Sequence, residues 1–282
     1  MPSPKTTFPR ISIIIPSYNQ AEYLEATLCS VLDQGYPNLE VILMDGGSKD
    51  GSQEIIERYA SHLAYWQSQP DEGQAAALNA GFARATGEVL TWLNSDDVLL
   101  PGALPLIGET LARFPEIVWL TGLPANIDAS GRLAEIGLPT TGRFRPFIQR
   151  GWYHGRALGF IRQEGTFWRR NLWERVGARL DPWRYFSLDY DLWRRFAAHA
   201  DLVTVASILA AYRYQPKQKT AELDRYYKEI GVRLPDRIRL LALPARALFT
   251  IVSWPFAPRV IYNRASAQWR FSAGPFFREG VL

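Results

Sequence analysis

Cysteine is nearly absent from this chain of 282 residues, which contains only Cys29. An intrachain disulfide is therefore excluded, and a reducing compartment, the cytoplasm, is the natural prediction. Long hydrophobic runs are also missing. No stretch of about 18 uncharged apolar residues predicts a transmembrane helix, and residues 1–10 lack the apolar core of a signal peptide. The three histidines are too scattered to form a metal site by spacing.

Charge is unevenly distributed along the chain. Residues 225–282 carry a balance of +7, whereas residues 1–224 carry −3. A nucleic-acid-binding domain would have its basic face on the body, so no nucleic-acid partner is predicted. Within the basic end, residues 236–264 mix arginines with aliphatic and aromatic residues. This pattern favours peripheral contact with the inner face of a membrane. The alternative is a helical appendage packed on the domain or on a second subunit of a homo-oligomer.

Apolar strand-like runs alternate with helical patterns through the first half of the sequence. Strands are expected at residues 11–15, 39–45, 63–69, 88–94 and 116–122, and helices at residues 21–32, 54–60, 71–87 and 102–114. The alternation predicts an α/β fold with a doubly wound, mostly parallel, Rossmann-like sheet. In such sheets, ligands bind outside the carboxyl ends of the strands.

Three of these strand ends carry polar groups, at residues 17–19, 45–48 and 94–97, so all three are expected to face one cleft. The last group contains Asp96 and Asp97, adjacent carboxylates that repel each other. A divalent cation, Mn²⁺ or Mg²⁺, would offset this repulsion, because both ions prefer oxygen ligands. The alternative is that the pair caps the helix after Pro101.

The second half of the sequence is less regular. Residues 122–160 mix Gly, Pro, Arg and aromatic residues without clear periodicity, which is typical of a long insertion or flap that carries specificity. The helix predicted at residues 187–200 begins with "SLDYDLWRRF". We therefore predict a domain over residues 1–220, with a regular half (about 11–121) and a less regular half (about 122–220). A basic, amphipathic, helical C-terminal region is predicted over residues 221–282.

Several motifs occur together in order. The segments "ISIIIPSYNQAEYLEATLCSVLDQGYPNLEVILMDGGSKDGSQEII" and "DEGQAAALNAGFARATGEVLTWLNSDDVLLPGAL" resemble the family 2 glycosyltransferases. The resemblance extends over residues 11–220 and implies a GT-A fold, an inverting reaction, a nucleotide-sugar donor and a divalent cation. It also implies that residues 11–121 are the nucleotide-binding half of the domain and residues 122–220 the acceptor half.

The resemblance also implies roles for individual residues. Asn94-Ser95-Asp96-Asp97 takes the place of the DXD motif, with Ser95 or Asn94 where the first Asp stands, and it would hold the metal chiefly through Asp97. Asp96 would contact the ribose or help to hold the ion. The remaining residues on the donor side would be Pro16, Ser17, Tyr18, Asp45, Asp71, Gly73 and Gln74.

On the acceptor side, Asp189 matches the catalytic base of the family, and Asp191, two positions further, is the runner-up. The alternative is that both are helix N-terminal acids favoured by the helix dipole. The acceptor would contact Glu164, Thr166 and Trp168, although core packing is an equal alternative for Trp168.

The stretch "AYRYQPKQKT" departs from the family pattern, because Gln215 replaces a histidine that can bind metal or diphosphate. Lys217 or Lys219 would partly compensate by contacting phosphate.

The sequence thus predicts an inverting glycosyltransferase that moves a sugar, from a UDP-sugar by preference, to a glycan or lipid-linked glycan in polysaccharide or glycolipid biosynthesis. The alternative is a non-catalytic nucleotide-sugar-binding or scaffold protein. A nucleotidyltransferase is disfavoured, because "PSYNQAEYLE" after the first strand lacks a glycine-rich loop with a basic residue.

Overall fold

The computed structural model describes residues 8–136, 143–215, 218, 222–231, 257–263 and 268–272. The elements up to the fourth long helix are β1 (Ile11–Ser17), α1 (Ala21–Leu32), β2 (Leu39–Asp45), α2 (Ser52–Tyr59), a 3-10 turn (Ala60–His62), β3 (Tyr65–Ser68), α3 (Gln74–Arg84), β4 (Val89–Trp92), β5 (Val98–Leu99) and α4 (Ala103–Arg113). The later elements are β6 (Trp119–Leu123), β7 (Ala125–Ile127), β8 (Leu133–Ile136), α5 (Arg145–Gln149), β9 (Thr166–Arg169), α6 (Arg170–Arg175), α7 (Leu188–Phe196), β10 (Val203–Ile208), β11 (Ala210–Arg213), α8 (Leu223–Glu229), β12 (Arg259–Asn263) and β13 (Gln268–Ser272).

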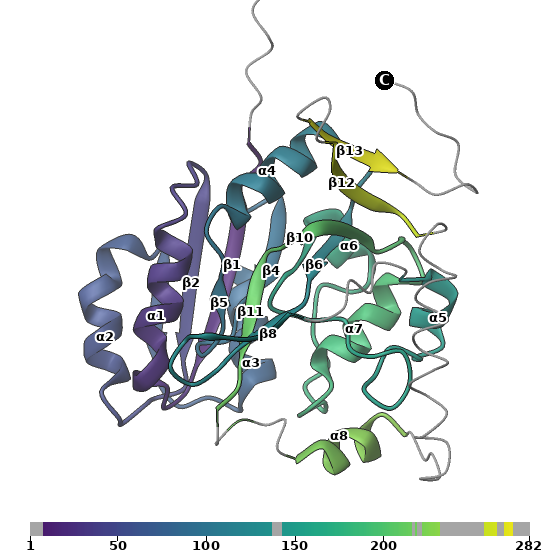
Figure 1. Ribbon diagram of the computed structural model, residues 1–282. Coiled ribbons are helices and arrows are strands. Elements are labelled where there is room, and N and C mark those ends of the chain that lie inside the picture. Colours follow the sequence, from purple (N-terminus) through teal and green to yellow (C-terminus); the bar gives the residue numbers. More distant parts are fainter. Residues whose placement is uncertain are drawn as a thin grey trace, which may run out of the picture.

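A large sheet runs through the centre of the molecule in the order β13-β12-β10-β6-β9-β4-β1-β2-β3 (Figure 1). Strands β4, β1, β2 and β3 pair in parallel, as do β6, β10 and β12. Strand β9 lies between β4 and β6 and runs antiparallel to both. The predicted α/β fold with a mostly parallel sheet is confirmed.

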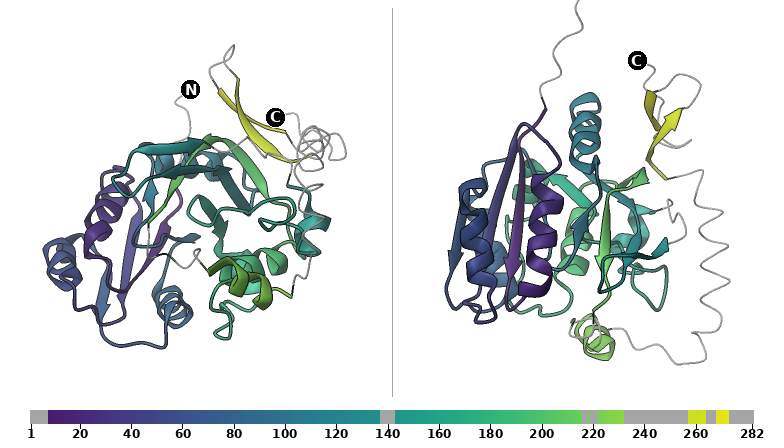
Figure 2. Two further views of the ribbon diagram at one scale, coloured as in Figure 1. Left: turned by 60° about the horizontal axis from the view of Figure 1, so that its bottom comes forward. Right: turned by 60° about the vertical axis from the view of Figure 1, so that its left-hand side comes forward.

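Helices cover both faces of this sheet, as the alternating sequence pattern requires (Figure 2). One apolar cluster joins strands β1 and β2 to helices α1, α2 and α4. A second joins the opposite face to α3, α5, α6 and α7. With both faces buried, the inner strands are apolar throughout: all seven residues of β1 are buried. The carboxyl ends of the parallel strands are left as the open edge for a ligand.

Residues 122–160 contain more structure than the sequence predicted. They form β7, β8 and α5 within the described residues. Strand β7 pairs with β8 and with β11, and β11 pairs with β5 in a smaller sheet. Because β5 begins directly after Asp97, this small sheet fixes β11 beside the carboxylate pair.

The C-terminal region differs from its prediction. The expected helix is present as α8, but residues 259–263 and 268–272 are strands that extend the central sheet. Val260 on β12 is fully buried in the core cluster. It belongs to the segment 236–264 that was predicted to contact a membrane, but at this position the side chain packs inside the protein. Residues 236–256 and 264 lie outside the described residues. In the part of the chain that the structure describes, no helix is long and apolar enough to cross a membrane.

Candidate functional site

The segments after β1 and β2 and the segment before α3 meet at one edge of the sheet. Gly46 lies between them: a Cβ on Gly46 would be 3.2 Å from Asp71 Oδ2 and 3.3 Å from Tyr18 Cδ2. The Tyr18 ring is 63% exposed, so one face is free to stack. Ser17 Oγ is buried and has no hydrogen-bond partner among the described residues. The structure therefore brings the predicted nucleotide-side residues together.

Asp45 ends β2 and is only 1% exposed. Its Oδ2 accepts hydrogen bonds from the backbone N–H of Gly47 at 3.1 Å and of Ser48 at 2.9 Å, and from Ser68 Oγ at 2.6 Å. Its Oδ1 accepts one from Ser48 Oγ at 2.5 Å. Asp45 thus shapes the glycine-rich loop after β2, and a direct contact with a nucleotide stays a prediction.

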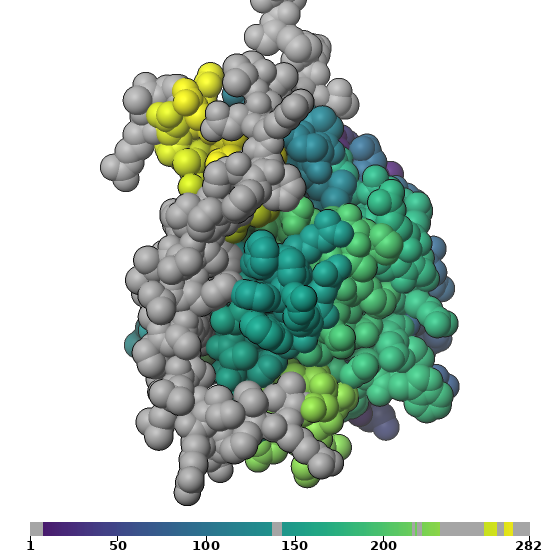
Figure 3. Space-filling model, turned by 90° about the vertical axis from the view of Figure 1, so that its right-hand side faces the viewer, coloured from purple at the N-terminus to yellow at the C-terminus, as the bar shows by residue number. Residues whose placement is uncertain are grey.

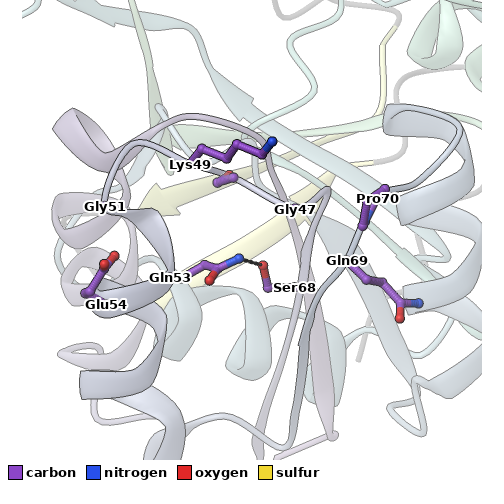
Figure 4. Close-up of a pocket in the computed structure, with 9 residues that line it drawn as sticks. Gly47, Lys49, Gly51, Gln53, Glu54, Ser68, Gln69 and Pro70 are labelled. Atoms are coloured by element: carbon purple, nitrogen blue, oxygen red, sulfur yellow. Dashed lines mark hydrogen bonds between the residues drawn. The ribbon is translucent and has the colours of Figure 1, made fainter.

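A shallow cavity of about 420 Å³ lies beside this loop, between α2 and the end of β3 (Figure 4). Gln53 Nε2 donates a hydrogen bond to Ser68 Oγ at 2.7 Å across its floor. Ser68 also contacts Asp45, so the cavity borders the nucleotide side of the site without including the carboxylate pair.

The Asp96–Asp97 pair is enclosed by polar contacts. Asp97 is completely buried, and its Oδ1 accepts from the backbone N–H of Arg213 at 2.9 Å, while its Oδ2 accepts from Asn94 Nδ2 at 3.1 Å. Gln74 Nε2 donates to Asn94 Oδ1 at 2.8 Å, which connects the start of α3 to the same network. Gln74, predicted on the nucleotide side, therefore joins Asn94 and the predicted metal ligand Asp97 in one cluster.

Gln215 contacts the carboxylate pair directly. Its Nε2 donates to Asp96 Oδ2 at 2.9 Å, and Arg213 Nε donates to the backbone oxygen of Asp96 at 2.7 Å. The residue at the predicted histidine position thus lies beside Asp96. Arg213 was missed from the sequence, although it belongs to the same stretch. Lys217 and Lys219 lie outside the described residues.

Glu164 is a third carboxylate near the pair. It precedes β9, is 4% exposed, and its Oε1 has no hydrogen-bond partner among the described residues. Burial raises the pKa of Glu164, and the Arg162 guanidinium opposes that shift. Burial, with the charges of Asp96 and Glu164, raises the pKa of Asp97 well above its ordinary value.

These raised pKa values indicate a negative site that lacks sufficient positive charge. Burial likewise raises the pKa of Asp96, while its hydrogen bond from Gln215 lowers it. A divalent cation would reverse these shifts, so the donor set fits one. No group of three or more His, Cys, Asp or Glu within the described ranges is arranged to hold a metal. Diphosphate and water oxygens would have to supply the other ligands.

Asp189 lies in the first turn of α7, and its Oδ1 accepts from the backbone N–H of Tyr190 at 2.8 Å. Burial raises its pKa to about 6, and the charge of Glu164 adds to that shift. A carboxyl with this pKa is mostly ionised at neutral pH and is more basic than an ordinary Asp, which suits a general base. Asp191 instead pairs with Arg195 Nε at 2.9 Å on another side of the helix.

The predicted acceptor contacts of Thr166 and Trp168 are not compatible with the structure, because both side chains are completely buried in β9. Thr166 Oγ1 donates to Arg162 O at 2.5 Å and bonds to Thr121 Oγ1 at 2.9 Å. The Trp168 ring packs against five aromatic residues of the core, Phe82, Trp92, Trp173, Trp193 and Phe196. Core packing, the alternative for Trp168, is correct. Glu164 faces the other carboxylates and is equally shielded from solvent.

Comparisons with known proteins agree with this arrangement. The sequence profile described as Glycosyl transferase family 2 matches residues 12–168. An uncharacterised glycosyltransferase of Rickettsia felis is 35% identical over 259 residues, covering 79% of this chain and 37% of that protein. TuaG of Bacillus subtilis, named for teichuronic acid biosynthesis, is 39% identical over 94 residues, covering 32% of this chain and 36% of TuaG. The chain thus spans about a third of the length of these curated relatives.

Two solved structures share the fold. S. aureus TarS 1–349 in complex with UDP-GlcNAc gives a TM-score of 0.61 at 16% identity, over 87% of this chain and 73% of that one. The mannosyltransferase PcManGT of Pyrobaculum calidifontis, in complex with GDP-Man and Mn²⁺, gives 0.58 at 20% identity, over 90% and 74%. At these identities the likeness concerns the fold, and the sequence relatives carry the family. The chain belongs to glycosyl transferase family 2.

Proposed function

We propose that this glycosyltransferase is metal-dependent and inverting, and that it transfers a sugar from a nucleotide-sugar, a UDP-sugar by preference, to a hydroxyl of a glycan or lipid-linked glycan. The observation that carries the proposal is the convergence of Asp96, Asp97, Glu164 and Asp189. The charge of Glu164 acts on the pKa of both Asp97 and Asp189. In this proposal, the metal–diphosphate site at Asp96 and Asp97 and the base Asp189 act on one substrate.

The nucleoside would lie over the loop after β2. Tyr18 offers an exposed ring, and Ser17 Oγ offers a buried hydroxyl without a partner in the described structure. Asp71 Oδ1 accepts from Gly73 N at 2.7 Å, which shapes the turn before α3. The N-terminus of α3 and its Gln74 would then face the phosphates, as helix N-termini favour anions.

The metal would be held by Asp97 and Asp96, and when bound it would neutralise charge on the departing diphosphate. Asn94 and Arg213 hold the Asp97 carboxylate in place through their N–H groups. Gln215 holds Asp96 in the same way. These fixed donors orient the two carboxylates before any donor sugar arrives.

Asp189 would act as the general base. It accepts the proton of the acceptor hydroxyl while that oxygen bonds to the anomeric carbon of the sugar. The bond from this carbon to the diphosphate breaks, the diphosphate leaves with the electron pair, and attack from the opposite side inverts the configuration. A pKa of about 6 keeps Asp189 ionised at neutral pH and basic enough to accept the proton.

The donor nucleotide is open to direct measurement. Among proteins of this fold, TarS was solved with UDP-GlcNAc and PcManGT with GDP-Man. Calorimetric titration of UDP, GDP and dTDP, each with and without Mn²⁺, is expected to give tight, Mn²⁺-dependent binding of UDP. Release of UDP from UDP-sugars, with water as acceptor, then measures turnover.

The outcomes separate the candidate functions. Mn²⁺-dependent binding with turnover supports the transferase. Binding without turnover, with any tested acceptor, would instead support a nucleotide-sugar-binding or scaffold protein. If the folded protein binds none of the nucleotides, both the transferase and the binding-protein functions are contradicted. Helix capping would then be the remaining explanation for Asp96 and Asp97. The basic C-terminal end supports a role at a membrane surface in polysaccharide or glycolipid synthesis, which vesicle flotation with anionic lipid would test.

A further inference from the structure

The N-terminus of α7, the helix that carries Asp189, is capped by a distant residue. Ser187 occupies the N-cap position, but its own side chain makes no capping hydrogen bond. Glu229, at the end of α8, supplies the acceptors instead. Its Oε1 accepts from Ser187 N at 3.0 Å and from Ser187 Oγ at 2.5 Å. Its Oε2 accepts from the backbone N–H of Phe186 at 3.1 Å and of Tyr185 at 3.2 Å.

This arrangement satisfies a general requirement of helices. Backbone N–H groups at and before the first turn have no acceptor within the helix, and the helix dipole makes this end positive. A carboxylate that binds three consecutive N–H groups meets both needs. A sequence separation of 42 residues between Ser187 and Glu229 hides this pairing from local sequence patterns.

Helix α8 is itself firmly docked. The Tyr226 ring packs edge-on against Tyr190 and Phe160. Asp224 pairs with Arg156 at 3.0 Å. Figure 3 shows α8 against the surface formed by the residues before β9. The cap is therefore held from two sides, by α7 and by the segment around residues 154–160.

Asp189 lies only two residues beyond Ser187, so the cap controls its surroundings. Burial and the charge of Asp189 raise the pKa of Tyr226 on α8. The other charged groups that act on Asp189 are Glu164 and Arg162, both from the segment before β9.

We propose that Glu229 is a positioning residue: by capping α7 from α8, it holds Asp189 in the geometry needed for proton transfer. The inference rests on the proposed role of Asp189 as base. It assigns to α8, which lies beyond the region matched by the family profile, a part in the reaction on the acceptor side.

The test compares Glu229→Gln with Glu222→Gln on the same helix. Glu222 is exposed and forms an ion pair with Arg225, so its replacement removes an equal charge and leaves the hydrogen bonds from residues 185–187 to Glu229 in place. With the UDP-sugar that the wild type hydrolyses, Glu229→Gln is expected to lower kcat about tenfold, because a small misplacement of the base slows the reaction strongly. UDP–Mn²⁺ affinity should stay within twofold, and Glu222→Gln should match the wild type.

The pH profile separates positioning from general damage. Without the Glu229 charge, the N–H groups of residues 185–187 and the positive end of the α7 dipole should stabilise ionised Asp189 and lower its pKa. The acid limb of kcat/KM should therefore move down by about half a pH unit. A wild-type kcat in Glu229→Gln would overturn the proposal, and so would a fall in kcat without this displacement. Glu229→Asp keeps the negative charge on a shorter side chain, so its kcat should lie between those of Glu229→Gln and the wild type.

Hydrogen exchange keeps the two proposals distinct. In Glu229→Gln, the amides of residues 185–187 should exchange faster than in the wild type, whether or not the protein transfers sugar. Unchanged protection would contradict the cap itself. If the cap is confirmed but the wild type turns over no donor, the transferase proposal fails and the positioning role falls with it. If the wild type is active and the cap is confirmed, only kcat and its pH profile decide.

Discussion

Residues 11–121 and residues 122–231 position their polar side chains in different ways. In the first region, each polar segment directly follows a strand, and the close packing of parallel strands brings the segments together. Asp45, for example, bonds to Gly47 and Ser48 within its own loop. Local sequence order is enough to assemble this side of the site.

In the second region, the polar side chains are positioned by contacts between residues that are distant in sequence. Ser187 is capped by Glu229, and Arg213 reaches Asp97 across 116 positions of sequence. Strand β9 enters the sheet antiparallel to its neighbours and brings Glu164 to the carboxylates. The difference teaches that strand order assembles most polar groups of residues 11–121, whereas tertiary contacts position those of residues 122–231.

The strongest way to break the donor side is Asp97→Ala. It removes the buried carboxylate and leaves the N–H groups of Arg213 and Asn94 without their acceptor. Mn²⁺-dependent binding of UDP is expected to fall below detection by calorimetry. Metal-independent binding, through Tyr18 and Ser17, should persist weakly. Normal Mn²⁺ dependence in this variant would contradict the assignment of the metal to Asp97.

The matching change on the acceptor side is Asp189→Asn. Loss of a general base is expected to lower kcat about 10³-fold, while UDP–Mn²⁺ affinity changes little. The raised pKa also means that ionisation of Asp189 destabilises the folded state, by an amount that grows between about pH 4 and pH 6 and reaches about 3 kcal/mol at higher pH. Asp189→Asn should therefore be more resistant to thermal unfolding than the wild type at pH 8, but not at pH 4. Asp191→Asn is the control and should retain turnover.

The pH dependence sharpens the same contrast. Asp189 must be ionised to accept a proton, and burial raises its pKa to about 6. The kcat/KM for donor turnover should therefore fall as pH decreases through about 6, tenfold for each further pH unit. Rates measured from pH 4.5 to 8.5 at constant ionic strength and saturating Mn²⁺ give this limb. A flat profile across pH 5–7 would contradict the base.

Most of the fold was predictable because apolar runs and helical periodicity are both local features of the sequence. Apolar runs marked β1, β2 and β4, and helical periodicity marked α1, α3, α4 and α7. Strand β9 was not predicted because it consists of only four residues, Thr166–Arg169. Its aromatic residues suit a sugar surface as well as a core, and only the burial of Trp168 decides between them. Strands β12 and β13 escaped because their arginines and aromatic residues also fit an amphipathic helix.

The site was predictable to the extent that its residues follow strands. Asn94, Asp96 and Asp97 were singled out from their place after a strand, whereas Asp189 was singled out through the resemblance to the family. The roles of Arg213 and Glu229 were not, because the backbone N–H of Arg213 is available to any residue type, and the partners of Glu229 are themselves backbone groups. The residue type at a position therefore does not show whether its backbone N–H will bind a carboxylate.

Gln215 connects the two regions, so its replacement tests how far they cooperate. Gln215 Nε2 donates to Asp96 Oδ2, whereas a histidine at this position would offer an imidazole nitrogen to the ion. Gln215→His is expected to tighten Mn²⁺-dependent UDP binding about tenfold, and to favour Mn²⁺ over Mg²⁺, which prefers oxygen ligands. Calorimetry with each metal measures both effects. Gln215→Asn, which shortens the side chain, is the control and should weaken binding with both metals.

The smallest functional effect is expected for Trp168→Phe. The ring is completely buried and its Nε1 has no hydrogen-bond partner within the described structure, so only packing is lost. The change should cost about 1–2 kcal/mol of folding free energy and lower Tm by a few degrees. Because Trp168 does not reach the cleft, kcat and KM measured below the new Tm should stay within twofold of the wild type. A rise in the KM for the acceptor alone would indicate that Trp168 contacts the acceptor. It would also weaken the contrast between the two regions.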